Sequence, residues 1–251
     1  MLYGVFSDIH SNLEALNIVL DYFKNCNVQS YICCGDIVGY GPYPNECVEK
    51  IRTLENLIIV MGNHDAAVCG LKDITWFNDY ARKAIIWTEK KLSKENKQYI
   101  SGLLKMVKVP SSYDLVLDKK INTFTVVHGS PRDPIDEYLL STDEMYENLS
   151  FFDTNICFVG HSHVPFVFDD GLATIDYNGV IKLNKNKKYI VNVGSVGQPR
   201  DYNPLSCCVL FDTDKNELKF VRLEYDVKKV QEKMQEYNLP QYLIDRLSVG
   251  K

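Results

Sequence analysis

Five short, mostly apolar runs in this chain lead into aspartate, histidine or asparagine, and this pattern constrains the fold more than any other feature. The runs at 2–6, 31–34, 57–61, 124–127 and 157–159 precede Asp8, His10, Asp36, Asn63, His64, Asp65, His128, His161 and His163. Runs of this kind predict buried strands. In open α/β sheets, ligands gather beyond the carboxyl ends of the strands. We therefore expect these polar side chains to meet at one site.

The last of these runs ends in a pair of histidines, in the sequence Gly160-His161-Ser162-His163. A strand that ends this way delivers two imidazoles to one place, and the small neighbouring residues let a ligand come close. Paired histidines also occur as ordinary surface residues, but all five histidines of the chain follow such runs. Because aspartate, histidine and asparagine bind divalent transition metals, the pattern predicts a metal site.

Composition excludes several classes of protein. The 251 residues suffice for one large domain or two small ones, and a net charge of −5 predicts no extended nucleic-acid surface. The N-terminal segment has the form of neither a signal peptide nor an anchor, and no apolar run approaches the roughly 20 residues of a membrane span. The eight cysteines form no Cys-x-x-Cys pair, and five of them lie in strand-like runs. We interpret them as reduced thiols of a cytoplasmic protein.

The first hundred residues alternate strand and helix, which predicts a parallel βαβαβ unit. Helices are expected after Ser11 and from Pro44, between strands at 2–6, about 30–34 and about 57–61. Residues 66 to about 106 then read as two helices, one with periodic side chains from Trp76 to Thr88 and one opened by Ser93. This segment is either a helical hairpin over the sheet edge or a lid beside the site. We favour a lid insertion over about 66–110.

The second half of the chain is rich in strands and returns to helix at 226–249. A helix opened by Ser141 breaks this region once. The predicted strands are 113–117, 122–127, 155–159, 165–168, 178–183, 189–193, 205–211 and 216–223.

The ordered motifs resemble one known family, the calcineurin-like metallophosphoesterases. They are Asp8-Ile9-His10, Gly35-Asp36, Gly62-Asn63-His64-Asp65, His128-Gly129 and Gly160-His161-Ser162-His163. Further segments at 39–42, 81–88 and 192–201 resemble a prokaryotic branch described as YfcE-like phosphodiesterases or as relatives of serine/threonine phosphatases and diadenosine tetraphosphatases. The resemblance implies an α/β fold, a four-layer α/β/β/α sandwich of two mixed sheets flanked by helices. It implies a single domain over 1–251.

The resemblance also implies two divalent metal ions. One ion is expected on Asp8, His10, Asp36 and His163, and the other on Asp36, Asn63, His128 and His161, with Asp36 as the bridge. Two metals roughly 3.5–4 Å apart can clamp the attacking and leaving oxygens of a phosphoryl displacement, and attack by a metal-bound hydroxide is the expected chemistry. Manganese is the expected metal, and this ligand set also accepts iron, zinc, cobalt or nickel.

The remaining candidate residues concern catalysis and substrate binding. The family pattern places His64 at the leaving oxygen, oriented by Asp65, where it could protonate or stabilise the leaving group. Arg132 and Arg200 are candidate phosphate clamps. Each could instead form a structural ion pair with the aspartate that follows it, Asp133 or Asp201.

The expected function is hydrolysis of phosphate esters, either phosphodiesters or phosphomonoesters. The expected substrate is a small molecule, a nucleotide or a phosphoprotein. One alternative within the enzymes is a phosphatase acting on phosphoproteins or dinucleoside polyphosphates. An alternative from another class is a non-catalytic metal-binding scaffold, but no expected ligand position is substituted here. The sequence leaves open the choice between monoesters and diesters, and also the oligomeric state.

Overall fold

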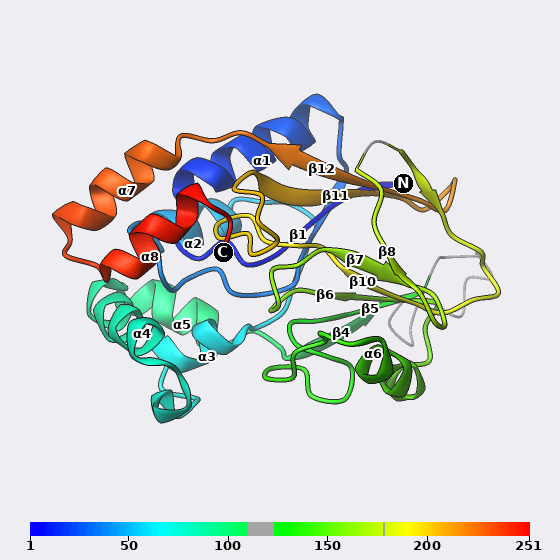
Figure 1. The fold of residues 1–251 in the computed structure, drawn as a ribbon, viewed down its shortest axis with the longest axis horizontal. Helices are drawn as coiled ribbons and strands as arrows, with labels where there is room; N and C mark the ends of the chain where they lie inside the picture. The colour runs from blue at the N-terminus through cyan, green and yellow to red at the C-terminus, as the bar shows by residue number, and fades with distance from the viewer. Residues whose placement is uncertain (110–122, 178) are drawn as a thin grey trace.

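The computed structural model describes residues 1–109, 123–177 and 179–251, and its strands form two six-stranded mixed sheets (Figure 1). The first sheet has the order β3 (Leu57–Ile59), β2 (Ser30–Cys33), β1 (Leu2–Phe6), β11 (Ser206–Asp212), β12 (Glu217–Leu223) and β9 (Ile181–Lys182). Strands β1, β2 and β3 are parallel, and the remaining pairs are antiparallel. The parallel half is the predicted βαβαβ unit.

The second sheet has the order β4 (Met106–Val109), β5 (Phe124–Val127), β6 (Ile156–Val159), β10 (Tyr189–Asn192), β7 (Phe166–Phe168) and β8 (Ala173–Thr174). Its central strands β5, β6 and β10 are parallel and buried at every position. This burial follows from apolar side chains on both faces of each strand, which is typical of parallel strands covered on both sides.

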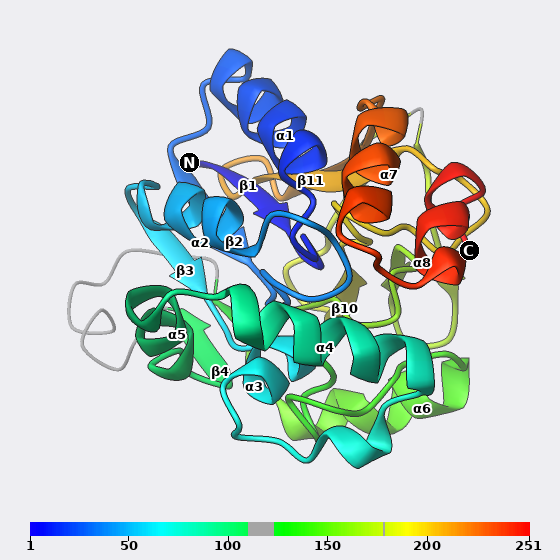
Figure 2. The same ribbon diagram turned by 90° about the vertical axis from the view of Figure 1, so that its left-hand side faces the viewer.

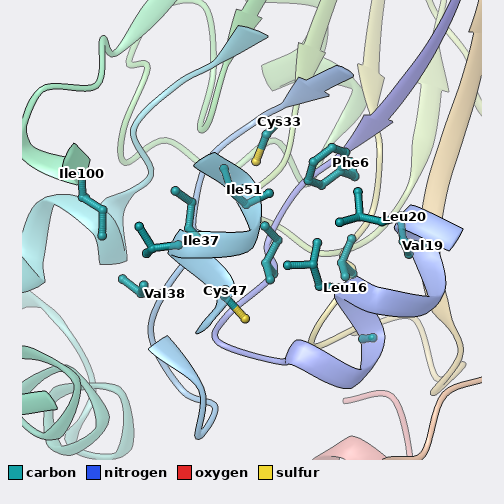
Figure 3. Close-up of a cluster of buried hydrophobic side chains, with 14 of the residues drawn as sticks. Phe6, Leu16, Val19, Leu20, Cys33, Ile37, Val38, Cys47, Ile51 and Ile100 are labelled. Carbon is teal, nitrogen blue, oxygen red and sulfur yellow. The ribbon is translucent and has the colours of Figure 1, made fainter. Parts of the chain in front are cut away.

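Three apolar layers hold the sandwich together. Side chains of both sheets, including Phe124, Phe158 and Phe211, form the core between them. Helices α1 (Leu13–Asn25) and α2 (Pro44–Arg52) pack on the outer side of the first sheet through Leu16, Ile51 and their neighbours (Figure 3). Helix α6 (Thr142–Asn148) covers the second sheet. The predicted class, an α/β sandwich of two mixed sheets flanked by helices, is confirmed.

A group of helices lies beside one end of the sandwich, as Figure 2 shows. It comprises α3 (Asn63–Val68), η1 (Ile74–Trp76), α4 (Asp79–Lys91), α5 (Lys94–Ser101), and from the C-terminal part α7 (Val227–Glu236), α8 (Gln241–Asp245) and η4 (Arg246–Ser248). Apolar side chains of α4, α7 and α8 share a cluster with Tyr40. None of the helices in the described ranges has the length and apolar character needed to cross a membrane.

Several predicted boundaries were wrong. The helical lid was expected over 66–110, but its last helix ends at Ser101. Residues 106–109 form strand β4, which pairs antiparallel with β5. The helix expected from Trp76 begins at Asp79, because the side chain of Asn78 accepts the backbone N–H of Ala81 and caps it there. The short strand β8 was not predicted. Among the described residues of the strand expected at 178–183, β9 alone is a strand, and the C-terminal helix is broken before Pro240. The strand predicted at 113–117 lies outside the described residues.

The register of the parallel strands aligns their carboxyl ends. Phe6 of β1 pairs with Cys33 of β2, and Cys33 pairs with Ile59 of β3. In the second sheet Val159, the last residue of β6, pairs with Asn192, the last residue of β10. The loops that follow these strands therefore leave the two sheets at the carboxyl ends of the parallel strands, where the polar residues of the motifs lie.

Candidate metal centre

The seven predicted metal ligands all lie at these strand ends, and all are buried. They are Asp8, His10, Asp36, Asn63, His128, His161 and His163. Within the described ranges, three groups of side chains have ligand atoms within 4.8 Å of one another: Asp8, His10 and His163; His10, Asp36 and His64; and Asp8, Asp36 and His128. These groups share members, so the site is one continuous cluster of potential ligands.

One half of the cluster surrounds the Nε2 atom of His10. This atom lies 3.1 Å from Nε2 of His163 and 3.7 Å from both Asp8 Oδ1 and Asp36 Oδ2. Nε2 of His163 is 3.2 Å from Asp8 Oδ1. These four side chains are the set expected for the first ion.

The other half surrounds the Nε2 atom of His128. This atom lies 3.1 Å from Asn63 Oδ1, 3.1 Å from His161 Nδ1 and 3.4 Å from Asp36 Oδ2. The Oδ2 atom of Asp36 therefore lies near both groups, which is where a bridging carboxylate would have to be.

Backbone carbonyls select the tautomer of each of the four histidines among the candidate ligands. The Nδ1 atoms of His10, His128 and His163 lie 3.2, 2.9 and 2.5 Å from the carbonyl oxygens of Val38, Cys34 and Gln198. His161 is reversed, with Nε2 3.1 Å from the carbonyl oxygen of Asp136. A ring nitrogen beside a carbonyl must hold the proton, so the other nitrogen of each ring presents a lone pair. In every case that nitrogen is the one that faces the cluster.

The cluster therefore brings together atoms that can accept a hydrogen bond but cannot donate one. Lone pairs of His10 and His163 face each other, and the same is true of His128 and His161. Asp8 Oδ1 is buried without a hydrogen-bond partner in the described part of the chain, while Asp8 Oδ2 accepts the backbone N–H of His161. Convergence of lone pairs and carboxylate oxygens without donors is unfavourable unless cations lie between them. The residues thus fit the divalent metals that the family implies.

The protonation states favour the same conclusion. Burial lowers the pKa values of His10 and His161 well below the usual histidine value and lowers that of His163 to about 4, which keeps these rings neutral and able to bind metal. Burial, with the nearby carboxylates of Asp65 and Asp8, raises the pKa of Asp36 well above its usual range. A cation beside Asp36 would remove this penalty.

The backbone at the site is held in an unusual conformation. Five of the seven candidate ligands have φ between 48° and 66°, the left-handed region that side-chain-bearing residues seldom adopt: Asp8, His10, Asp36, His161 and His163. Each such residue costs on the order of 1–3 kcal/mol, and such strain gathers at functional sites. The fold thus stabilises a costly arrangement at the positions that face the cluster.

Two glycines allow the strand-end loops to approach the carboxylates. A Cβ atom on Gly62 would lie 2.0 Å from Asp36 Oδ1, and one on Gly160 would lie 2.5 Å from Asp8 Oδ2. Any side chain at either position would displace a carboxylate, so the glycine in each motif has a steric reason.

The structure corrects the predicted relation between His64 and Asp65. The carboxylate of Asp65 accepts the backbone N–H groups of Gly62 (3.1 Å) and Val38 (3.2 Å) and so fixes the loops around the site. No hydrogen bond joins Asp65 to the ring of His64, whose Nδ1 is buried without a partner among the described residues. The His64 ring is held instead between aromatic rings, with centroids 4.4 Å from Tyr40 and 5.0 Å from Phe77.

The two candidate arginines lie in different surroundings. The guanidinium of Arg200 donates to Tyr40 Oη (3.4 Å) and Gln198 Oε1 (2.9 Å). Burial lowers the pKa of His64 most, and the positive charge of Arg200 lowers it further. The Nε atom of Arg200 is buried without a partner, and no carboxylate pairs with it in the described part of the chain. Asp201, its expected partner, pairs with Arg222.

Arg132 is engaged on the surface. Its guanidinium pairs with the carboxylates of Glu137 and Glu147, not with Asp133 as the sequence suggested. A clamp on phosphate would have to break both pairs, so of the two arginines only Arg200 is free of paired carboxylates in the described part of the chain.

A cavity of about 420 Å³ lies against the cluster and contains residues that sequence reasoning missed. Its wall includes Asn63, His64 and His161, and also the aromatic side chains of Tyr40, Trp76, Phe77 and Tyr138. The ring of Tyr138 stacks on that of His161 with centroids 3.7 Å apart. Tyr40 belongs to the segment 39–42 that contributed to the resemblance, whereas no pattern around Tyr138 signals a role.

Comparison with known proteins agrees with this geometry. The calcineurin-like phosphoesterase superfamily domain matches residues 1–216, and the chain belongs to this superfamily, whose members are generally metal-dependent hydrolases. An uncharacterized protein of Methanocaldococcus jannaschii is 43% identical over 252 residues, which cover 99% of this chain and 98% of that protein.

Solved structures extend the likeness to the whole fold. A metallophosphoesterase from Sphaerobacter thermophilus is 38% identical, with a TM-score of 0.86 over 100% of this chain and 99% of that one. A hypothetical protein from Pyrococcus horikoshii OT3, 23% identical, shares the fold with a TM-score of 0.81 over 100% of this chain and 98% of that one. The predicted family is thereby confirmed.

Proposed function

We propose that this chain is a dinuclear metal-dependent phosphoesterase that hydrolyses phosphate esters. Asp8, His10, Asp36 and His163 would hold one divalent ion, and Asp36, Asn63, His128 and His161 the other. The observation that carries the proposal is the convergence of histidine lone pairs and carboxylate oxygens on two adjacent points that share Asp36 Oδ2. When bound, the two ions would supply Lewis acidity and a water of lowered pKa as nucleophile.

The chain's own residues would complete the reaction. His64 lies at the junction of the cluster and the cavity, where its ring can reach the leaving oxygen and give it a proton. Arg200 provides a cation without a paired carboxylate in the described chain, suited to bind a non-bridging phosphate oxygen. Asp65 holds the two loops in place without facing the substrate.

The proposed setting is the cytoplasm, with manganese as the metal. All eight cysteines lie within the described residues and are free thiols, which suits a reducing compartment. The nitrogen and oxygen ligands suit manganese, and they also suit iron, zinc, cobalt or nickel.

Turnover of chromogenic esters tests the proposed activity. The metal-stripped protein should not hydrolyse 4-nitrophenyl phosphate or bis(4-nitrophenyl) phosphate, and added manganese should restore hydrolysis of at least one of them. The ratio of the two rates would establish the preference for monoesters or diesters. Absence of turnover with manganese, iron, zinc, cobalt and nickel in turn would contradict the proposal and favour a metal-binding scaffold.

A further inference from the structure

The cavity beside the candidate metal centre has the size of a small-molecule site. Its volume of about 420 Å³ falls within the roughly 300–1,000 Å³ of ligand pockets. Asn63, His64 and His161 form part of its wall, so a molecule in the cavity would touch both the metal ligands and the residue proposed to protonate the leaving oxygen. Protonation of the leaving oxygen by His64, as proposed above, would therefore place the leaving group of the ester in this cavity.

The rest of the wall is aromatic. Tyr40, Trp76, Phe77 and Tyr138 all line the cavity. Trp76 is 83% exposed and belongs to the short helix η1, so packing in the core does not account for its position. Aromatic side chains at the edge of a cavity offer flat apolar faces on which a planar ring can stack.

Polar groups accompany the aromatic rings. The Nζ atom of Lys72 lies 2.6 Å from Asp136 Oδ2, and both side chains line the cavity together with Asn78. Lys72 Nζ also lies 5.8 Å from the centroid of Phe77. A ligand that suits this wall has flat faces for stacking and polar atoms at its edges, which describes a nucleobase.

We propose that the cavity binds the nucleoside part of a nucleoside phosphate, with the base stacked on Trp76. This inference rests on the proposed function and names its substrate class. In the reaction, the oxygen of a water forms a bond to phosphorus and the bond from phosphorus to the nucleoside oxygen breaks. The released oxygen receives a proton from His64, and the proton lost by the water restores His64. The products are the nucleoside and phosphate.

Equilibrium binding tests the cavity without turnover. The probe is a phosphonate analogue of adenosine 5′-monophosphate in which a methylene group replaces the ester oxygen, and its control is the same compound without the base. In a Trp87→Phe protein, Trp76 is the single remaining tryptophan of the two in the chain. With manganese bound, the adenosine analogue should quench its fluorescence saturably, and the baseless control should not.

Substitution of Trp76 then measures the contribution of stacking. Measured by isothermal titration calorimetry, which needs no tryptophan, Trp76→Ala should weaken binding of the adenosine analogue by roughly 5- to 150-fold and leave that of the baseless control unchanged. Trp76→Phe should retain most of the affinity. Tyr146→Ala, which removes an exposed aromatic residue outside the cavity wall, should have no effect. Because Trp76 is exposed, its removal should leave the thermal unfolding temperature within a few degrees of wild type.

The outcomes separate this inference from the proposed function. Hydrolysis of adenosine 5′-monophosphate and ribose 5-phosphate with equal kcat/KM, unchanged in Trp76→Ala, would overturn the nucleoside site but keep the phosphoesterase. A phosphotyrosine peptide bound through Trp76 more tightly than the adenosine analogue would also overturn it. Failure of the protein to hydrolyse any ester when loaded with manganese, iron, zinc, cobalt and nickel in turn would contradict the proposed function itself.

Discussion

Asp36→Asn should lose both metal ions and lower phosphoesterase turnover by more than roughly 100-fold. Replacing groups outside the ligand shell typically costs roughly 10- to 100-fold, and Asp36 Oδ2 lies 3.7 Å from His10 Nε2 and 3.4 Å from His128 Nε2, within reach of both groups of ligands. The substitution keeps Oδ1, which accepts the backbone N–H of His64 at 2.8 Å, and replaces the oxygen that faces His10 and His128. The loop should therefore keep its shape while the bridge disappears.

Thermal unfolding of the metal-free proteins separates loss of the bridge from loss of the fold. Burial and neighbouring carboxylates raise the pKa of Asp36, so a neutral amide should make the metal-free variant at least as stable as metal-free wild type. Asp153→Asn, at an exposed carboxylate paired with Lys108, serves as the control and should keep both ions and full turnover. An Asp36→Asn protein with two bound ions and near-normal turnover would show that the bridge is assigned to the wrong residue.

His64→Ala should keep both metal ions and lower turnover by roughly 10²–10⁴, the usual contribution of a positioned general acid. The loss should depend on the leaving group. It should be small for nitrophenyl esters, whose phenolate leaves without a proton, and large for alkyl esters and nucleotides, whose alkoxide leaves poorly. Burial and the charge of Arg200 lower the pKa of His64 in the metal-free protein, and a phosphate anion bound beside the ring would oppose this shift and favour the protonated form.

The measurement is a series of esters with graded leaving-group pKa, compared between wild type and His64→Ala. Metal content is determined for both proteins. A loss of equal size across the series, or a loss accompanied by missing metal, would make His64 a supporting residue. The backbone N–H of His64 donates to Asp36, and alanine keeps that hydrogen bond. Missing metal in His64→Ala would therefore have to come from loss of the imidazole ring and not from loss of this backbone contact.

The sequence predicted where the candidate ligands would gather because their positions depend on strand ends. Parallel register aligns the carboxyl ends of β1, β2 and β3 in one sheet and of β6 and β10 in the other. Residues that directly follow these strands, such as Asp8 and Asp36, have little freedom to lie elsewhere. The alternation of apolar runs and helices predicted the parallel βαβαβ unit of the first sheet, whereas the sandwich of two mixed sheets was implied by the family resemblance.

Pairs of neighbouring residues were predicted less well. Consecutive residues on a helix point in different directions, so Asp65 at the start of α3 cannot face the ring of His64. Arg132 and Arg200 likewise do not pair with the aspartates that follow them. Arg132 pairs with Glu137 and Glu147, and Asp201 is engaged by Arg222 instead of Arg200. The carbonyl groups of Val38, Cys34 and Gln198 that fix the histidine rings leave no mark in the sequence, because every residue has a carbonyl.

The helical segment shows a further limit of periodicity. Trp76 and Phe77 continue the apolar spacing of α4 backwards, yet Asn78 caps that helix and frees both side chains to line the cavity. Strand β4 was missed because Met106–Val109 is short and only partly buried, so its alternation is weak. Whether the helices act as a lid stays a prediction.

The metal content of the active protein tests the central proposal most directly. The protein would be stripped with chelator, reconstituted with manganese, freed of unbound metal, and measured by elemental analysis together with its phosphoesterase activity. The account predicts close to two ions per chain at full activity, with activity lost on chelation and regained as the second ion binds. Full activity with no more than one ion per chain would contradict it.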